Sequence, residues 1–174
     1  TIGSGLQRNL GATLGASNHP GVIVTVTSLD SSIVLVSPNA ATAGTGSYQT
    51  AVLPGATSVP LVISSLAGRI ADTVSVRLEA PGFVTTTFSA YVWQPVFQLS
   101  GLNATASTLA VDDPIYVSVG TPSAPAGTSI WNADDARVGG GPIPVTMVND
   151  NPGIGTLVTT ATSADSVTVL IAEG

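Results

Sequence analysis

The 174-residue sequence contains no cysteine, no lysine and one histidine, and these absences exclude several kinds of site. Without cysteine there is no disulfide framework, no thiolate metal site and no cysteine nucleophile. A zinc site built from several histidines is excluded, and any Ser–His–Asp triad would have to use His19. No Gly-x-Ser-x-Gly nucleophile motif accompanies His19. We therefore expect a loop histidine and a protein that is not an enzyme.

Charged residues are scarce and mostly acidic. They make up 8% of the chain, whereas ~25% is typical of soluble domains. Four basic residues, all arginine, face ten acidic ones, which gives a net charge of −6. Proteins that bind nucleic acid by neutralising phosphates need an excess of positive charge. We therefore expect no nucleic-acid partner.

Long hydrophobic runs are also absent, although 44% of the residues are hydrophobic. A membrane-spanning helix needs about 20 consecutive apolar residues. The apolar stretches here, such as 21–24 and 167–172, are short and broken by Thr or Ser. The sequence therefore predicts no membrane span. Because no basic and apolar leader opens the sequence, any signal peptide has been removed or lies outside it.

Short alternating runs of β-branched and hydroxyl residues dominate the sequence. Such runs, separated by Pro-Gly and Gly-rich turns, are typical of antiparallel β-strands. No segment keeps a helical apolar stripe over ten residues. Strands are predicted at 22–27, 33–36, 59–63, 73–78, 84–93, 96–99, 115–119, 145–148, 156–160 and 167–171. The predicted fold class is all-β, with β-sandwich architecture.

An internal repeat divides the chain into two predicted domains. Ser4-Gly5-Leu6 recurs as Ser100-Gly101-Leu102, Val24-Thr25 as Val145-Thr146, and Ser58-Val59 as Ser166-Val167. A second alignment pairs 22–26 with 115–119 instead. The predicted domains are 1–94 and 95–174, with a boundary near Trp93-Gln94-Pro95, because proline suits a stiff connector. The second domain is expected to carry a long loop insert near 120–142.

The second predicted domain has nothing that matches the strands at 73–78 and 84–93. It is therefore either incomplete or built differently from the first. An incomplete sandwich exposes an edge that invites a strand from another chain. We considered residues 1–14 as one candidate for such a donated strand.

Residues 24–38 (VTVTSLDSSIVLVSP) resemble the strand–turn–strand core of bacterial immunoglobulin-like repeats. Ala80-Pro81-Gly82-Phe83, before a Thr-rich strand, is similar to their final hairpin. The resemblance covers most of 1–94 and, more loosely, the rest. It implies two tandem immunoglobulin-like antiparallel β-sandwiches from a large secreted or surface protein, adhesin- or invasin-like, of a bacterium or archaeon. The family has no catalytic motif, so no catalytic residue is implied.

Acidic residues near predicted turns are weak candidate calcium ligands: Asp112, Asp113, Asp134, Asp135 and Asp150. Calcium takes six to eight oxygen ligands, so clusters that converge in space could share an ion. The segment 149–152 (NDNP) also resembles the calcium-linker motif of cadherins, but it lies inside the second domain and lacks the preceding Asp-x. The alternative is turn chemistry, because Asp and Asn close tight turns through their own backbone. No other cofactor is expected.

Trp131 lies in the Gly-, Pro- and Ala-rich insert and is the candidate partner-binding residue. The scarcity of charge also removes the lysines and glutamates that normally prevent edge-to-edge pairing of sheets. We therefore expect an extracellular structural or adhesive protein that self-associates into a stalk, fibre or surface filament, with strand donation between subunits as one route. The alternative is a module of a secreted protein that binds a carbohydrate or a cell-surface receptor.

Overall fold

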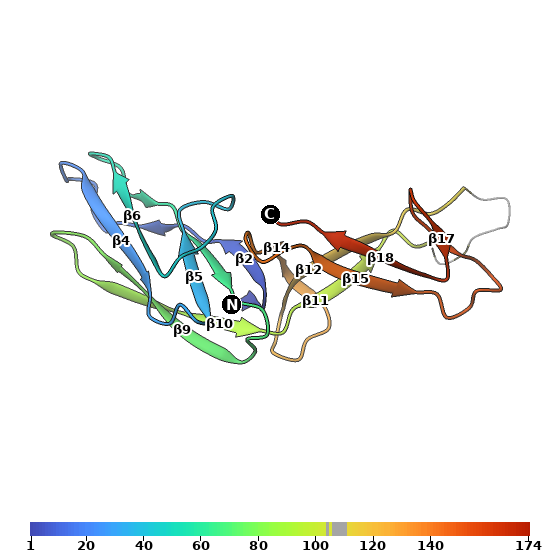
Figure 1. Ribbon diagram of the computed structural model, residues 1–174. Helices are drawn as coiled ribbons and strands as arrows, with labels where there is room; N and C mark the ends of the chain where they lie inside the picture. The colour runs from blue at the N-terminus through green and yellow to red at the C-terminus, as the bar shows by residue number, and fades with distance from the viewer. Residues whose placement is uncertain (104, 106–110) are drawn as a thin grey trace.

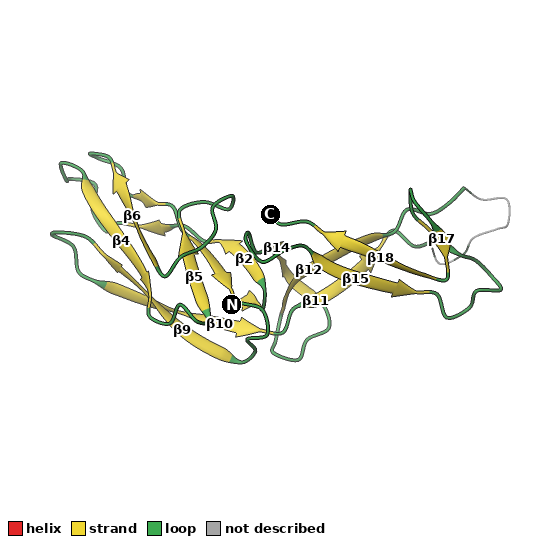
Figure 2. Ribbon diagram, in the orientation of Figure 1, coloured by secondary structure: helices red, strands yellow, loops and turns green. Residues whose placement is uncertain are grey.

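The computed structural model describes residues 1–103, 105 and 111–174, and these residues form strands and loops without a helix (Figures 1 and 2). The predicted all-β class is therefore confirmed. None of the described segments is a helix of the length and apolarity that crossing a membrane requires. The molecule is elongated, with residues 1–94 (the N-terminal half) at one end and residues 95–174 (the C-terminal half) at the other. Both termini lie near the middle.

The larger sheet of the N-terminal half has five strands. Their order is β1 (Ile2–Gly3), β10 (Thr86–Trp93), β9 (Asp72–Glu79), β4 (Val22–Ser28) and β6 (Ser47–Val52). Neighbouring strands are antiparallel except for β1 and β10, which run parallel.

The second sheet of this half has four strands, one of which comes from the C-terminal half. Their order is β14 (Asp135–Ala136), β2 (Leu6–Asn9), β8 (Val62–Ser65) and β5 (Val34–Ser37). Strands β3 (Ala12–Thr13) and β7 (Ser58–Val59) form a separate short antiparallel pair. Because β14 pairs with β2, the two halves share a sheet.

One hydrophobic core lies between these two sheets. Strand β4 shows the pattern, because Val24 and Val26 are buried while Thr25 and Thr27 are half-buried. Strands β8 and β9 supply Ile63 and Val76 to the same cluster. Sixteen of the nineteen buried hydrophobic residues in the described chain belong to the N-terminal half. This half therefore has a complete core.

The C-terminal half consists of small, separate sheets. One has three strands, β11 (Val96–Ser100), β12 (Tyr116–Pro122) and β13 (Ile130–Ala133). The other two have two strands each: β15 (Ile143–Val148) with β18 (Ser166–Ile171), and β16 (Leu157–Val158) with β17 (Ser163–Ala164). Only Val119, Ala136 and Val167 are buried hydrophobic residues among the described residues of this half.

Each of the ten predicted strand segments contains at least part of a strand, and the predicted break at 94–95 separates β10 from β11. The segment near 120–142 is not a plain loop, because it contains β13 and β14 and reaches back to β2. The repeat does not predict the pairing: β15 pairs with β18, whereas the aligned β4 pairs with β6 and β9. Tertiary context, rather than the local apolar pattern, decides these partners.

Residues 1–14 form part of their own chain's structure. Strands β1, β2 and β3 are all paired within the described chain, and Ile2 and Leu6 are fully buried. Donating this segment to a neighbour would remove two large side chains from the core. The suggestion from sequence that residues 1–14 form a free donor strand is therefore wrong, because these residues already pair within their own chain.

Candidate association surfaces

A buried ion pair joins the two halves. Arg8 on β2 meets Asp134, between β13 and β14, through Nε–Oδ1 at 2.7 Å and Nη2–Oδ2 at 2.8 Å. The Asp134 side chain is fully buried and that of Arg8 is 16% exposed. The Thr121 hydroxyl donates a further hydrogen bond to Asp134 Oδ2 at 2.5 Å. Because a buried carboxylate is costly unless paired and hydrogen-bonded, this geometry fixes the junction.

Gln7, the neighbour of Arg8, links three separate segments. Its Nε2 donates to the Ala40 carbonyl at 2.8 Å and to the Gly174 carbonyl at 3.3 Å. Its Oε1 accepts a hydrogen bond from the Val138 N–H at 3.0 Å. The residue is 2% exposed, so these bonds satisfy an amide that would otherwise be buried at a cost.

Glu173 ties the end of the described chain to the same junction. Its carboxylate accepts hydrogen bonds from the N–H groups of Gly139 and Gly141, which hold the pKa of Glu173 below its ordinary value. The Gly174 N–H donates to the Ala136 carbonyl at 3.0 Å. Both Gly139 and Gly141 have positive φ, a conformation that brings their N–H groups around the carboxylate. The junction is thus held by β2, the 134–141 segment and residues 173–174.

The five acidic residues predicted as calcium candidates have different surroundings. Asp134 is paired with Arg8, and Asp135 lies on β14 with an exposed side chain. Asp113 accepts a hydrogen bond from Asn103 Nδ2 at 2.6 Å, and Asp112 and Asp150 are exposed. Across the described residues, no group of three His, Cys, Asp or Glu side chains is placed to hold a metal ion. Calcium binding stays a prediction without a site assigned to it.

The sheet of β15 and β18 has one wholly apolar face, here called the β15–β18 face. The register sets three apolar pairs opposite one another: Ile143 with Ile171, Val145 with Val169, and Met147 with Val167. Val167 is 5% exposed, whereas the other five residues are only half-buried. The opposite face is mixed: Thr146 and Thr168 are hydrogen-bonded at 2.9 Å, and Val148 and Leu170 are exposed. The apolar face is therefore incompletely covered.

The β11–β12 pair also has an apolar face that is incompletely covered. Phe97 lies opposite Val119 and Leu99 opposite Val117, which places four apolar residues on one face. Val119 is 4% exposed, but Phe97 is 46% and Leu99 is 51% exposed. A folded domain normally covers such side chains, because apolar area left in water forfeits about 25 cal/mol per Å². The C-terminal half leaves Phe97 and Leu99 about half exposed to solvent.

Strand β18 has an open edge. In the described chain it pairs with β15 alone, and its six residues include no charge and no proline. Strand β15 contains Pro144, which cannot donate a backbone hydrogen bond. Long edges without charge, proline or a bulge are ready to pair with another chain. The β18 edge is therefore the more open of the two.

Trp131 and His19, both singled out from sequence, lie at different places. Trp131 on β13 is 72% exposed, so its indole is available to a partner. His19 Nε2 bonds the Ala56 carbonyl at 2.7 Å, and the Gly21 N–H donates to Nδ1 at 3.2 Å. Both ring nitrogens of His19 thus hold loops together.

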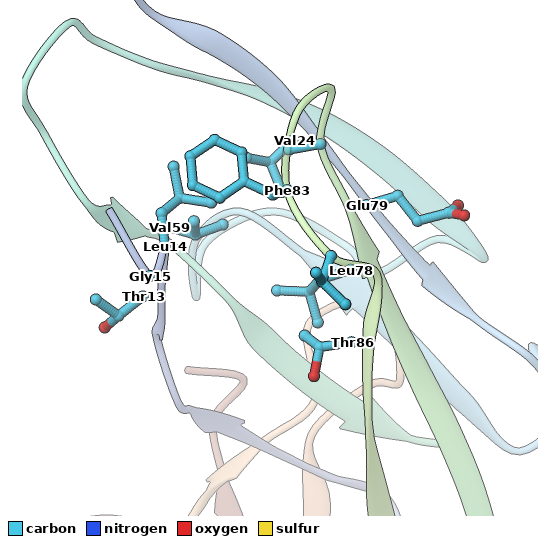
Figure 3. Close-up of a pocket in the computed structure, with 11 residues that line it drawn as sticks. Thr13, Leu14, Gly15, Val24, Val59, Leu78, Glu79, Phe83 and Thr86 are labelled. Atoms are coloured by element: carbon cyan, nitrogen blue, oxygen red, sulfur yellow. The ribbon is translucent and has the colours of Figure 1, made fainter. Parts of the chain in front are cut away.

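A pocket of about 240 Å³ opens at the end of the N-terminal half away from the junction (Figure 3). Leu14, Val24, Val59, Leu78 and Phe83 supply its apolar wall, and the lining includes one ionisable group, Glu79. Sequence reasoning missed this pocket because its walls come from four separate segments, 13–15, 24, 59 and 78–86. Neither paired carboxylates nor a nucleophile–base pair lines it, so it supports no particular reaction.

Comparison with known proteins found no protein-family model, no curated protein sequence and no solved structure that matches the chain. Its function therefore has to be inferred from its own surfaces.

Proposed function

We propose that the chain is a structural or adhesive unit of an extracellular stalk, fibre or surface filament that associates with neighbouring polypeptide by β-strand addition. One observation carries the proposal: the C-terminal half leaves its apolar sheet faces only partly covered and the β18 edge unpaired, while the N-terminal half is closed. Exposed apolar patches rimmed by polar residues are typical of interaction sites. A bacterial or archaeal cell surface is the proposed location.

The sheet orders of the N-terminal half support an immunoglobulin-like unit. Its sheets, β14-β2-β8-β5 and β10-β9-β4-β6, follow the ABED and GFC order of that fold, with a further strand beside C. Two features depart from it: β5 comes between β4 and β6 in the chain, and β14 of the C-terminal half takes the place of strand A. We propose tandem immunoglobulin-like sandwiches, the second of them incomplete without added strands.

The junction supports a mechanical role in a stiff stalk. The Arg8–Asp134 pair and the hydrogen bonds of Gln7 with Val138 and Gly174 bridge the halves, so bending between them would break buried polar contacts. A stalk that presents an adhesive surface needs stiffness of this kind. A flexible linker would not provide it.

Analytical ultracentrifugation over a wide concentration range, with electron microscopy of the same samples, tests the proposal. We expect concentration-dependent association and elongated or filamentous particles. Leu99→Lys, which places a charge on the exposed face of the edge strand β11, should weaken association, because edge lysines oppose strand pairing. The matched control is Tyr91→Lys, at an exposed position of the closed half, and should leave association unchanged. A chain that stays monomeric at high concentration and forms only isolated particles contradicts the proposal.

A second candidate function, binding of a carbohydrate or protein receptor, rests on the exposed Trp131. Aromatic side chains such as tryptophan are enriched at binding hot spots. Glycan-array binding that is lost in Trp131→Ala but kept in Tyr116→Ala would support it. Absence of binding on the array would remove the glycan version of this alternative.

A further inference from the structure

We propose that the β18 edge takes up an antiparallel β-hairpin of another polypeptide, with the chemistry of this chain's own β9–β10 hairpin. That chemistry is two strands of six to eight residues with small apolar side chains at alternate positions and little net charge. The proposal rests on the proposed function and specifies the partner of its association surface.

The β9–β10 hairpin closes the N-terminal half. Strand β9 pairs with β4 on one side and β10 on the other. The inward residues of the hairpin, Val74, Val76, Leu78, Ala90 and Val92, are all at most 9% exposed. Strand β4 thus has a neighbour on each side. In the described C-terminal half, no hairpin plays this role for β15 or β18.

The β18 edge has the geometry to accept such a strand. Its inward residues Val167, Val169 and Ile171 alternate with exposed ones, as do those of β9. A strand added beside β18 would extend the β15–β18 face by a further row of side chains. The second strand of the hairpin would widen that row and cover the half-buried residues. The absence of charge and proline from β18 leaves its backbone free to pair.

Charge and burial favour a separate hairpin over a second copy of this chain. The C-terminal half has seven acidic residues and one arginine, so it carries the whole net charge of −6, whereas the N-terminal half has three of each sign. Two C-terminal halves meeting edge to edge would bring these charges together, with Asp165 and Glu173 flanking each β18. A second copy's β9–β10 hairpin is also enclosed, since Val76 and Val92 are 0% exposed. The partner hairpin should therefore carry little net charge.

The probe is a synthetic peptide of residues 72–93 added to the full chain, with hydrogen exchange read by mass spectrometry. We expect exchange in 166–171 and 143–148 to slow by about tenfold or more at saturating peptide. The control peptide carries Val74→Ser, Val76→Ser and Leu78→Ser, which keeps length and charge but removes the apolar row. It should give no protection.

Two protein variants locate the contact. Leu170→Lys, on the exposed side of β18, should abolish the protection, and Val148→Lys, on the exposed side of β15, should keep it. Equal protection by the control peptide, or protection confined to 72–93 of the protein, overturns the proposal. Tight self-association that protects 166–171 and is unaffected by peptide also overturns the hairpin proposal, because a second copy of the chain then occupies the β18 edge. The proposed function stands in that case. If the chain binds the peptide but never self-associates, the hairpin site stands and the proposed self-assembly is overturned.

Discussion

The two halves use the same kinds of strand residue but reach different degrees of closure. Both are built from short strands rich in Val, Thr and Ser, yet sixteen buried hydrophobic residues lie in the N-terminal half and three in the C-terminal half. The difference lies in pairing. Two sheets of four and five strands cover one another's apolar faces in the first half, whereas two- and three-stranded sheets in the second leave theirs half open. A correct local pattern therefore does not guarantee a core.

The comparison is tested most severely at the junction. Arg8→Ala leaves the buried Asp134 carboxylate with the Thr121 hydroxyl as its one remaining side-chain hydrogen-bond donor, so we expect a loss of about 3–5 kcal/mol in the free energy of unfolding. Urea unfolding measures it. The matched control is Arg77→Ala, which removes an exposed pair with Glu79 and should cost at most about 1 kcal/mol. Similar small losses in both variants would show that the junction does not hold the halves together.

Truncation of apolar side chains compares the halves directly. Ile63→Ala, at a 1% exposed position, should cost about 2–5 kcal/mol because it leaves a cavity in a closed core. Leu99→Ala, at a 51% exposed position, should cost less than about 1 kcal/mol, since little packing is lost. Both are measured by urea unfolding. A large loss from Leu99→Ala would mean that the C-terminal half has a well-packed core.

Acid should lower the free energy of unfolding through Glu173, by less than the Arg8→Ala and Ile63→Ala substitutions do. Its folded-state pKa lies below the ordinary value because of hydrogen bonds from Gly139 and Gly141. The carboxylate therefore contributes stability above the usual glutamate pKa of about 4.3, and this contribution disappears as the pH falls through the lowered value. Unfolding at pH 7 and at pH 3 should show a stability difference between the wild type and Glu173→Gln that shrinks in acid. A difference that is constant with pH contradicts this role.

Sequence patterning located the strands whose apolar residues alternate, and it did less well where a strand is polar. Strand β2 contains Gln7 and Arg8, both employed at the junction, and was not predicted. Strand β6 was missed because its alternation is carried by Tyr48, Thr50 and Val52, of which only Val52 is buried. In both strands, tertiary contacts supply what the local hydrophobic pattern lacks.

The association surface was only partly predictable. The absence of counterparts to β9 and β10 was visible in the repeat, so an exposed edge could be expected. The repeat does not show which edge is open, because this depends on the pairing of β15 with β18, which the repeat alignment does not predict. The Arg8–Asp134 pair spans 126 positions and leaves no local signal in the sequence. Asp134 was therefore considered as a calcium candidate rather than as an ion-pair partner.

Native-state hydrogen exchange of the unmodified chain tests the central claim most directly, because it measures the closure of each half in one experiment. We predict that β9 and β10 exchange only through global unfolding. Strands β15 and β18 should exchange through local opening, about a hundredfold faster or more. Equal protection of β10 and β18 in a monomeric chain would contradict the account, because the C-terminal half would then be closed without a partner.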